Sequence, residues 1–445
     1  MGAAVAAGAP ATVEVALDVL RAGGNAVDAA VGAAFAMPVT EPALASLGGG
    51  GFMMIRDADG RTHLLDFFAA VPSRPTADMI RLTVEFSGAQ QDFEVGPGSV
   101  AVPGMLPGLL AAHAEHGRLP RVEVLAAAHR VVARGAALSP AQALVLRLIE
   151  AVLTLTPESA AVYAPGGRLL QAGEVLHNPA YAVFLEELLD GRETLPGIGP
   201  LAADDLAAYR VYDREPLAVD LPGALVLTNP PPSLGGSIIA YALAELPAEP
   251  TALDLLLALQ VATDHNKSTA PVSVRGTTHI SVTDGAQTVA MTVSNGSNSG
   301  VMLPGTGIQL NNMMGESDLH PDGHELVPGA RIRSMMAPSL VECGGVVTAL
   351  GTGGSERIRS ALTRVIAGLV RGVDLRAAID LPRIHLDNDG VVQVEPGFPA
   401  EQVAALPRPL SQWRAEDFYF GGVHAVSSDG VAAADARRGG CTGWA

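Results

Sequence analysis

A nearly polar-free stretch at residues 26–37 restricts the fold of this 445-residue chain more than any other feature. It is long enough for a helix of about three turns, yet almost all of its side chains are apolar, so it has no polar face for water. Asn25, which directly precedes it, is a residue type that caps helix N-termini. We predict a helix that begins after Asn25 and is buried in the interior.

Strands and helices alternate along the rest of the chain. Residues 11–22 have helical spacing and end at a Gly-Gly pair, and residues 106–189 are mostly helical with proline and glycine interruptions. A tetraglycine leads into a hairpin with strands 52–55 and 64–68. The other predicted strands are 217–227, 278–283, 288–294, 340–341 and 346–350, and the other predicted helices are one opened by Gly235, 357–370 and 375–379. Two sheet-forming regions flanked by helices indicate an α+β fold with stacked layers.

The composition disfavours several classes of function. Hydrophobic residues make up 48% of the chain and charged residues 17%, which indicates a large buried core. The net charge of −18 disfavours nucleic acids and anionic membranes as partners, since both bind basic surfaces. The chain starts without a basic signal-peptide segment, contains no apolar run of membrane-spanning length, and has only two cysteines, Cys343 and Cys441. We expect a soluble cytoplasmic protein without a cofactor, and the sequence is compatible with a homo-oligomer.

The segment that begins at Gly276-Thr277-Thr278 carries the main candidate for chemistry. A threonine at the start of a chain is both nucleophile and base, because its α-amine has a reference pKa of roughly 7.7–8.0 and accepts the hydroxyl proton near neutral pH. Thr277 becomes such a residue only if the bond after Gly276 is cleaved, and the missing Cβ of Gly276 eases attack by the Thr277 hydroxyl. An ordinary strand that starts after a glycine is the competing interpretation, and the triplet alone favours it.

A second glycine-rich segment, at residues 351–355, lies between a predicted strand and a predicted helix. Its backbone amides are candidates for an oxyanion hole, the set of N–H donors that stabilises the anionic oxygen formed during acyl transfer. A tight strand–helix turn is the alternative. The segment lacks the Lys-Ser/Thr pair of a phosphate-binding loop, which argues against nucleotide binding.

Six such motifs occur in a fixed order along almost the whole chain. They are GGNAVDAA at 23–30, GGGGFM at 48–53, NPPPSLGG at 229–236, TTHISV at 277–282, GGS at 353–355 and DARRGG at 435–440. With these motifs the chain resembles the γ-glutamyltranspeptidase family of N-terminal nucleophile hydrolases. The resemblance implies a four-layer αββα sandwich with a mostly helical extension. It also implies autocleavage into a large subunit, residues 1–276, and a small subunit, residues 277–445, which share one core.

The resemblance further implies roles for residues at the reacting end of the site. Gly276 and Thr277 match the family's cleavage site, and Thr277 matches its acyl-accepting nucleophile. Ser294 matches a second hydroxyl, usually a threonine, that orients the nucleophile. Gly353 and Gly354 match the oxyanion-hole glycines. The reacting end is therefore retained.

The end of the pocket that binds the amino-acid part of the substrate departs from the family pattern. Phe68 occupies the place of an arginine that grips the substrate α-carboxylate, and phenylalanine cannot make that charged, bidentate contact. The other positions matched to substrate binding are Asn295, which is retained, Glu316 for an aspartate, Met313 for Gln or Glu, Ser334, which is retained, and Met335 for a second serine.

Two explanations for these departures remain open. Either Arg331 or Arg333 binds the substrate carboxylate instead, or the pocket is less polar and accepts amides other than γ-glutamyl compounds, as in cephalosporin acylases that resemble this family. The segment after Glu316 is short, which predicts a reduced lid and favours hydrolysis over transfer. We expect an autoprocessed γ-glutamyltransferase-like amidohydrolase that forms an acyl-enzyme on Thr277 from a small-molecule amide, glutathione-like compounds being the family's substrate class. A cephalosporin-acylase-like amidase and a non-catalytic relative are the alternatives.

Other polar residues carry weaker hypotheses. His279, on the strand after Thr277, is expected to be structural, and Arg437 and Arg438 are expected to pair with carboxylates between the subunits. No Gly-x-Ser-x-Gly elbow is present, which argues against an α/β-hydrolase. One polar loop contains Asp318, His320, Asp322, His324 and Glu325. This loop is either a metal site or a solvated segment, and the expected chemistry needs no metal.

Overall fold

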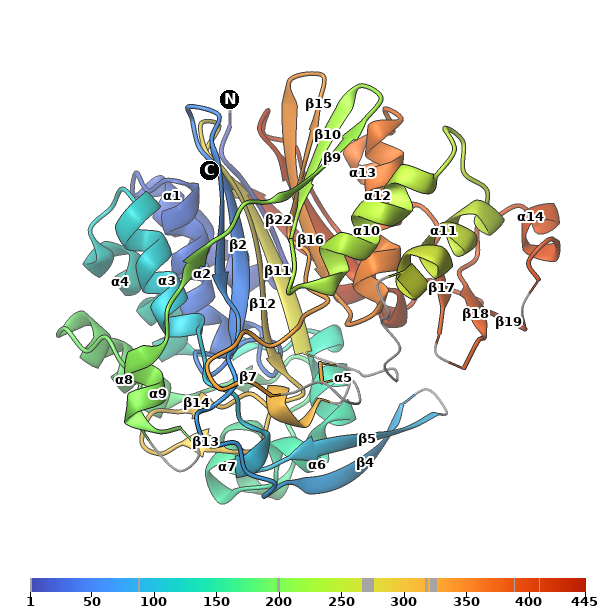
Figure 1. Ribbon diagram of the computed structural model, residues 1–445. Helices are drawn as coiled ribbons and strands as arrows, with labels where there is room; N and C mark the ends of the chain where they lie inside the picture. Colours follow the sequence, from blue (N-terminus) through green and yellow to red (C-terminus); the bar gives the residue numbers. More distant parts are fainter. Residues whose placement is uncertain are drawn as a thin grey trace.

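The computed structural model describes residues 2–86, 89–197, 201–265, 276–316, 319–320, 326–387, 389–407 and 409–445. Two large β-sheets lie against each other in the centre of the molecule, and helices lie on the outer side of each (Figure 1). Both helices and sheets build the core, so the predicted α+β class is confirmed.

The first sheet has seven strands, each antiparallel to its neighbours. In spatial order they are β22 (Cys441–Trp444), β1 (Ala4–Ala7), β11 (Gly276–Thr283), β12 (Thr288–Gly296), β2 (Gly50–Arg56), β3 (Thr62–Phe67) and β8 (Tyr212–Asp213). Every residue of β11 and β12 is buried. Strand β1 thus lies beside the strand that begins with Gly276, and β22 lies on the other side of β1.

The second sheet has six antiparallel strands. In spatial order they are β21 (Ala432–Ala434), β20 (Gly422–Ser427), β16 (Val346–Gly353), β15 (Ser339–Cys343), β10 (Ala224–Thr228) and β9 (Leu217–Leu221). Because side chains alternate along a strand, Val289 and Met291 of β12 pack into the core on the helix side, whereas Ala290 packs between the sheets. Ala349 of the second sheet belongs to the same core cluster, and its position two residues before Gly351, which faces His279 of β11, places it on the inter-sheet side, so small side chains let the sheets pack closely.

Helices cover the outer faces of both sheets (Figure 1). On the first sheet lie α1 (Pro10–Arg21), α2 (Ala26–Thr40) and α3 (Met105–His116), with α4 (Arg121–Arg134) packed on α1 and α2; on the second lie α10 (Leu234–Glu245), α12 (Arg357–Val370) and α13 (Leu375–Asp380), with α11 (Ala252–His265) packed on α10. Helix α2 is buried along its whole length, as predicted. Its N-terminus is a capping box in which Asn25 and Asp28 exchange side chain–backbone hydrogen bonds.

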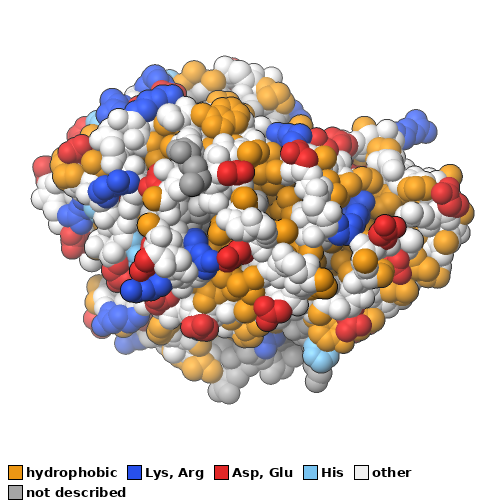
Figure 2. Space-filling view, turned by 90° about the horizontal axis from the view of Figure 1, so that it is seen from above, with side chains coloured by type: hydrophobic (Ala, Val, Ile, Leu, Met, Phe, Trp, Pro, Cys, Tyr) orange, Lys and Arg blue, Asp and Glu red, His pale blue; other side chains and the backbone are white. Residues whose placement is uncertain are grey.

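Smaller elements surround this core. The stretch predicted as mostly helical also contains α5 (Pro140–Leu148), α6 (Glu150–Leu153), α7 (Pro157–Tyr163) and α8 (Pro179–Leu189), and two short helices, α9 (Ala203–Ala208) and α14 (Ala400–Ala404), follow. The small sheets are β4 (Ile80–Phe86) with β5 (Ala89–Val95), β6 (Ala136–Ala137) with β7 (Val175–Leu176), β13 (Met302–Leu303) with β14 (Ile308–Gln309), and β17 (Ile384–Leu386) with β18 (Val392–Val394) and β19 (Leu410–Gln412). In the described part of the chain, no helix combines the length and apolar character that a membrane span needs. On the face seen in Figure 2, acidic and basic side chains are interspersed among hydrophobic ones.

One predicted element is wrong. The single strand expected over residues 217–227 is a hairpin of two strands, β9 and β10, because the chain turns at Gly223, whose φ of +78° favours glycine. Apolar residues on both sides of this turn conceal it in the sequence pattern. Strand β1 and the β4–β5 hairpin were not predicted, although β4 alternates apolar and polar residues; only its partner β5 is mostly polar and lacks that pattern.

Candidate active site

Thr277 lies near the start of the central strand β11, directly opposite Ser294 of β12. The pairing register shifts between Gly276 and Thr277, so the peptide bond that joins them lies at an irregularity of the sheet. A Cβ on Gly276 would overlap the backbone oxygen of Ala43, so only glycine fits there. The Thr277 side chain is buried, yet it borders two cavities, one on each side of the strand.

A chain of hydrogen bonds connects the Thr277 hydroxyl to the carbonyl of the preceding residue. Thr277 Oγ1 donates to Ser294 Oγ at 3.2 Å, and Ser294 Oγ donates to the carbonyl oxygen of Gly276 at 2.7 Å. The backbone N–H of Gly296 donates to the same Ser294 oxygen at 3.0 Å. This arrangement fixes the single proton of Ser294 on the Gly276 carbonyl and polarises that carbonyl toward attack.

Gly353 and Gly354 are the expected oxyanion-hole residues. Gly353 is the last residue of β16, and Gly354 directly follows it. A Cβ on Gly353 would overlap the backbone oxygen of Thr277, which shows how closely the two strands approach. Gly354 has a φ of +135°, a conformation that side chains other than glycine rarely adopt. Both glycines are therefore required by the backbone beside Thr277.

A small pocket opens on one side of Thr277, and we call it the front pocket. It is lined by Phe68, Thr277, Ser294, Met313, Glu316, Leu319, Ser334, Met335, Met336, Ser355 and Ile358. The structure thus brings together the predicted nucleophile, its hydroxyl partner and five of the six positions matched to substrate binding, although these come from distant parts of the chain.

The front pocket is apolar apart from hydroxyls and one carboxyl group. Glu316 is the only charged residue among the described lining residues, and its Oε1 accepts from the Ser297 backbone N–H at 3.0 Å. Phe68 is buried and stacks on Phe52 with ring centroids 5.5 Å apart. No lysine, arginine or histidine is among the described residues that line this pocket.

Residues 12–252 and 255–443 match the family profile described as gamma-glutamyltranspeptidase. The chain belongs to the γ-glutamyltranspeptidase family. It is 30% identical over 463 residues to the acylase ACY 1 proenzyme of Pseudomonas sp. (strain V22), a match that covers 87% of this chain and 83% of that protein. It is 28% identical over 484 residues to the glutathione hydrolase proenzyme of Escherichia coli (strain K12), covering 88% and 82%. The crystal structure of a cephalosporin acylase from Bacillus halodurans has the same fold, with a TM-score of 0.83, 24% identity, and coverage of 99% of this chain and 95% of that one.

In this member of the γ-glutamyltranspeptidase family, the arginines proposed as substitutes for the missing one lie outside the front pocket. Arg331 Nε donates to Asp66 Oδ1 at 3.2 Å, and its guanidinium stacks on the Tyr209 ring at 4.3 Å. Asp66 is completely buried and also accepts from Arg214 at 2.7 Å. Arg331 is therefore held by a structural carboxylate, and Arg333 does not line the pocket either.

The structure gives hydrogen-bond partners for three further residues that the sequence analysis singled out. The Asn295 amide nitrogen donates to Asn298 and to the Gln309 carbonyl, so Asn295 braces a neighbouring loop and does not line the front pocket. His279 is buried with both ring nitrogens hydrogen-bonded, to Thr292 and Ser281, which confirms a structural role. His320 Nε2 lies 2.8 Å from the Met313 carbonyl. The other residues of the possible metal loop lie outside the described residues: Asp318, Asp322, His324 and Glu325.

The expectation for the two arginines near the C-terminus is wrong. Arg437 forms ion pairs with carboxylates, but among the described residues its partners lie within residues 277–445 rather than across the predicted cleavage point; they are Glu395, Asp435 and Glu416. Arg438 has no carboxylate partner among the described ion pairs, and its guanidinium instead stacks on Phe418 at 3.9 Å from the ring centroid. Burial lowers the pKa of Arg438 to about 9.

A second cavity, the rear cavity, lies on the other side of Thr277 and contains a residue that the sequence did not point to. Its lining includes Gly8, Glu41, Thr277, Thr278, Gly353, His424 and Arg438. Glu41 is fully buried and accepts hydrogen bonds from the hydroxyls of Thr278 and Thr12. Burial raises the pKa of Glu41 to about 7, and these hydrogen bonds oppose the increase. The one available signal was an acidic residue directly after a buried apolar helix, since a charge there must be neutralised or hydrogen-bonded.

Proposed function

We propose that this chain is an autoprocessing amidohydrolase that uses Thr277 as its N-terminal nucleophile. The observation that carries the proposal is the relay from the Thr277 hydroxyl through Ser294 to the Gly276 carbonyl. In this arrangement the hydroxyl of Thr277 and a hydrogen-bond donor on the preceding carbonyl oxygen lie together, which are the two groups that attack on that carbonyl needs. Membership of the γ-glutamyltranspeptidase family and the proenzyme names of its relatives support the same conclusion.

The self-cleavage step follows from this geometry. Thr277 Oγ1 attacks the carbonyl carbon of Gly276 while Ser294 donates to the carbonyl oxygen. The hydroxyl proton passes to the Thr277 nitrogen, whose bond to that carbon breaks to give an ester and an amine. Water then hydrolyses the ester, which leaves a carboxylate on Gly276 and frees both the hydroxyl and the α-amine of Thr277. The products are the fragments 1–276 and 277–445, held together in the αββα arrangement of an N-terminal nucleophile hydrolase.

The mature site repeats this chemistry on a substrate. The Thr277 α-amine takes the hydroxyl proton, the hydroxyl attacks an amide carbonyl in the front pocket, and the amine leaving group departs. The amides at Gly353 and Gly354 stabilise the tetrahedral oxyanion, and Ser294 orients the nucleophile. Water or another amine then releases the acyl group from Thr277.

The front pocket favours acyl groups without an α-carboxylate. The place of the arginine holds Phe68, both matched methionines line the pocket, and its one charged lining residue, Glu316, is negative. A γ-glutamyl group would bring a second carboxylate into this pocket, and no cation among the described lining residues would pair with it, which is costly. We therefore favour a cephalosporin-acylase-like amidase over a glutathione hydrolase.

The test begins with the fragments of the purified protein. The wild-type chain is expected to separate into two fragments on a denaturing gel, with Thr277 found at the start of the smaller one by N-terminal sequencing. Thr277→Ala is expected to remain one chain, and Thr277→Ser, which keeps a hydroxyl, is expected to cleave. Two fragments from Thr277→Ala would refute self-cleavage by this residue.

A panel of amides then separates the candidate functions. Neutral acyl amides are expected to be hydrolysed faster than γ-glutamyl-p-nitroanilide by the processed enzyme. Faster turnover of the γ-glutamyl compound would favour a glutathione hydrolase. A cleaved protein that no acylating reagent labels on Thr277 would instead support a non-catalytic binding protein.

A further inference from the structure

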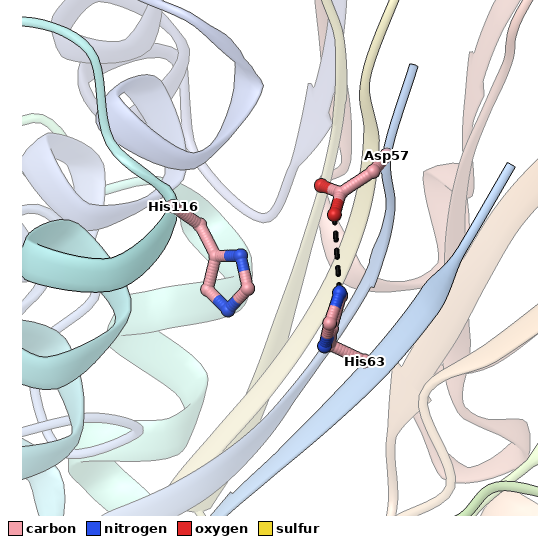
Figure 3. A group of neighbouring side chains, drawn as sticks. All are labelled: Asp57, His63 and His116. Atoms are coloured by element: carbon pink, nitrogen blue, oxygen red, sulfur yellow. Dashed lines mark ion pairs between the residues drawn. The ribbon is translucent and has the colours of Figure 1, made fainter. Parts of the chain in front are cut away.

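Three potential metal ligands meet between helix α3 and the β2–β3 hairpin, at a place that the proposed function does not use (Figure 3). Asp57 follows β2, His63 lies in β3, and His116 is the last residue of α3. One ligand atom from each lies within 4.8 Å of the others. Asp57 Oδ2 is 3.1 Å from His63 Nε2, and the two imidazole rings have centroids 4.6 Å apart.

Neighbouring groups orient two of these ligands. His63 Nδ1 lies 3.2 Å from Asp213 Oδ2, a contact that places a proton on Nδ1. Nε2 of His63 then points its lone pair at the Asp57 carboxylate, so either a second proton or a cation must lie between them. Gln287 Nε2 donates to the other Asp57 oxygen at 3.1 Å. Histidine ligands of metals characteristically donate their second N–H to a carboxylate in this way.

The third ligand has a buried nitrogen without a hydrogen bond. Within the described part of the chain, Nε2 of His116 is inaccessible to solvent and has no hydrogen-bond partner. The nearest carboxylate oxygen, on the adjacent Glu115, is 3.9 Å away, too far for a hydrogen bond. Buried polar atoms of this kind are rare in proteins and call for a partner.

We propose that Asp57, His63 and His116 bind one Zn²⁺ ion. Two imidazole nitrogens and one carboxylate oxygen are a donor set that zinc accepts, with water in the fourth tetrahedral position. In such a site, ligand atoms about 2.0–2.1 Å from the metal are roughly 3.3 Å apart. The Asp57–His63 pair already has nearly that spacing, and His116 needs to approach by roughly 1.5 Å.

The location indicates a structural rather than a catalytic ion. Strand β2 pairs Gly50 with Ser294 at the active-site end and Arg56 with Thr288 at the opposite end, where Asp57 follows. An ion there would fasten α3 to the β2–β3 hairpin and, through Gln287, to the β11–β12 turn. Zinc is therefore expected to raise thermal stability without changing self-cleavage.

Tag-free protein, stripped with a chelator, provides the test. Titration with Zn²⁺ by calorimetry is expected to give one site per chain, and Co²⁺ is expected to give the strong visible absorption of tetrahedral coordination. His116→Ala and Asp57→Asn are expected to lose at least tenfold in affinity, and Asp213→Asn is expected to lose about 10- to 100-fold by freeing the His63 tautomer. The matched control is His129→Ala, which removes a partly exposed histidine paired with Glu186 elsewhere on the helical layer.

Each outcome decides the proposal. Zinc binding that the ligand variants weaken and the control does not would support it, as would a rise in the melting temperature with Zn²⁺ that disappears in His116→Ala. Absence of Zn²⁺ and Co²⁺ uptake by folded wild-type protein would overturn it in favour of a protonated His63 between two aspartates. Binding that all variants, including the control, retain or lose equally would also overturn it. Asp57→Asn, which changes few atoms, covers the case in which His116→Ala does not fold.

Discussion

Replacement of Glu41 by glutamine should make the folded chain more stable at neutral and alkaline pH. The Glu41 side chain is fully buried beside Thr278, and burial raises its pKa from 4.5 to about 7. Glutamine has nearly the same shape and can keep the hydrogen bonds. Its oxygen can accept from the Thr278 hydroxyl and its amide can donate to the Thr12 hydroxyl, which also contacts Thr40.

The sign and size of the effect follow from the two pKa values. The folded state keeps the Glu41 proton up to about pH 7, whereas the unfolded chain releases it near pH 4.5. The contribution of this proton to stability is therefore complete below the unfolded pKa and is lost as pH rises through the folded pKa. The difference amounts to about 3 kcal/mol, since each pKa unit corresponds to about 1.4 kcal/mol. An uncharged glutamine side chain at this position does not undergo this loss.

Urea unfolding from pH 4.5 to pH 8 measures the effect. Both proteins carry Thr277→Ala, so that each unfolds as one uncleaved chain. The free energy of unfolding of Glu41→Gln, minus that of the parent, is expected to grow by about 3 kcal/mol across this range. Glu14→Gln, which removes a surface carboxylate paired with Arg134, is the control and is expected to change by less than about 1 kcal/mol. A difference that stays constant with pH would refute the assignment of a neutral, buried Glu41.

Two predictions concern the reaction itself. Ser294→Ala removes the hydroxyl that donates to the Gly276 carbonyl, so self-cleavage is expected to slow by roughly 100-fold or more, measured as the loss of full-length chain on a gel; an unchanged rate would show that Ser294 does not assist the step. Phe68→Arg restores a cation to the front pocket and is expected to lower the KM for γ-glutamyl-p-nitroanilide, whereas Phe68→Leu, the control for altered packing, is not. Equal gains from both variants would show that pocket volume and not charge limits that substrate.

The buried helix and the central hairpin could be predicted because local rules decide them. Asn25 caps α2, and Asp284 and Gly285 form the tight turn that places β11 beside β12. Because the two antiparallel strands flank that turn, Thr277 and Ser294 must lie close to each other. Gly353 was predicted from its family motif alone, and it lies in the second sheet, against the backbone oxygen of Thr277.

The roles of Arg331 and Glu41 depend on tertiary contacts, which the sequence does not reveal. Arg331 is available for a substrate carboxylate in the sequence, but in the fold Asp66 and two tyrosine rings hold it. Glu41 belongs to no motif, and its importance follows only from its burial beside Thr278. Strand β5 lacks the apolar alternation on which strand prediction depends, whereas the turn at Gly223 is concealed because apolar residues continue on both sides of it.

Glu316 should select against negatively charged acyl groups, independently of the missing arginine. Its side chain is buried in the front pocket and accepts from the Ser297 amide, an interaction that a glutamine oxygen at this position can keep. Two like charges about 6–15 Å apart repel each other by about 1–3 kcal/mol at an effective dielectric constant of about 20. Glu316→Gln is therefore expected to raise kcat/KM for a glutaryl amide about tenfold relative to a neutral amide of equal length.

The comparison of two substrates on one variant separates charge from fit. Glu316→Asp keeps the negative charge and serves as the matched control, so its preference for the neutral amide should persist. If Glu316→Gln improves the glutaryl and the neutral amide equally, the carboxylate does not set specificity. If only the glutaryl amide gains, the preference of this enzyme has two separable causes, the absence of a cation at Phe68 and the presence of an anion at Glu316. In that case Phe68→Arg combined with Glu316→Gln should accept carboxylate-bearing acyl groups better than either single variant, because each change removes a different part of the electrostatic cost.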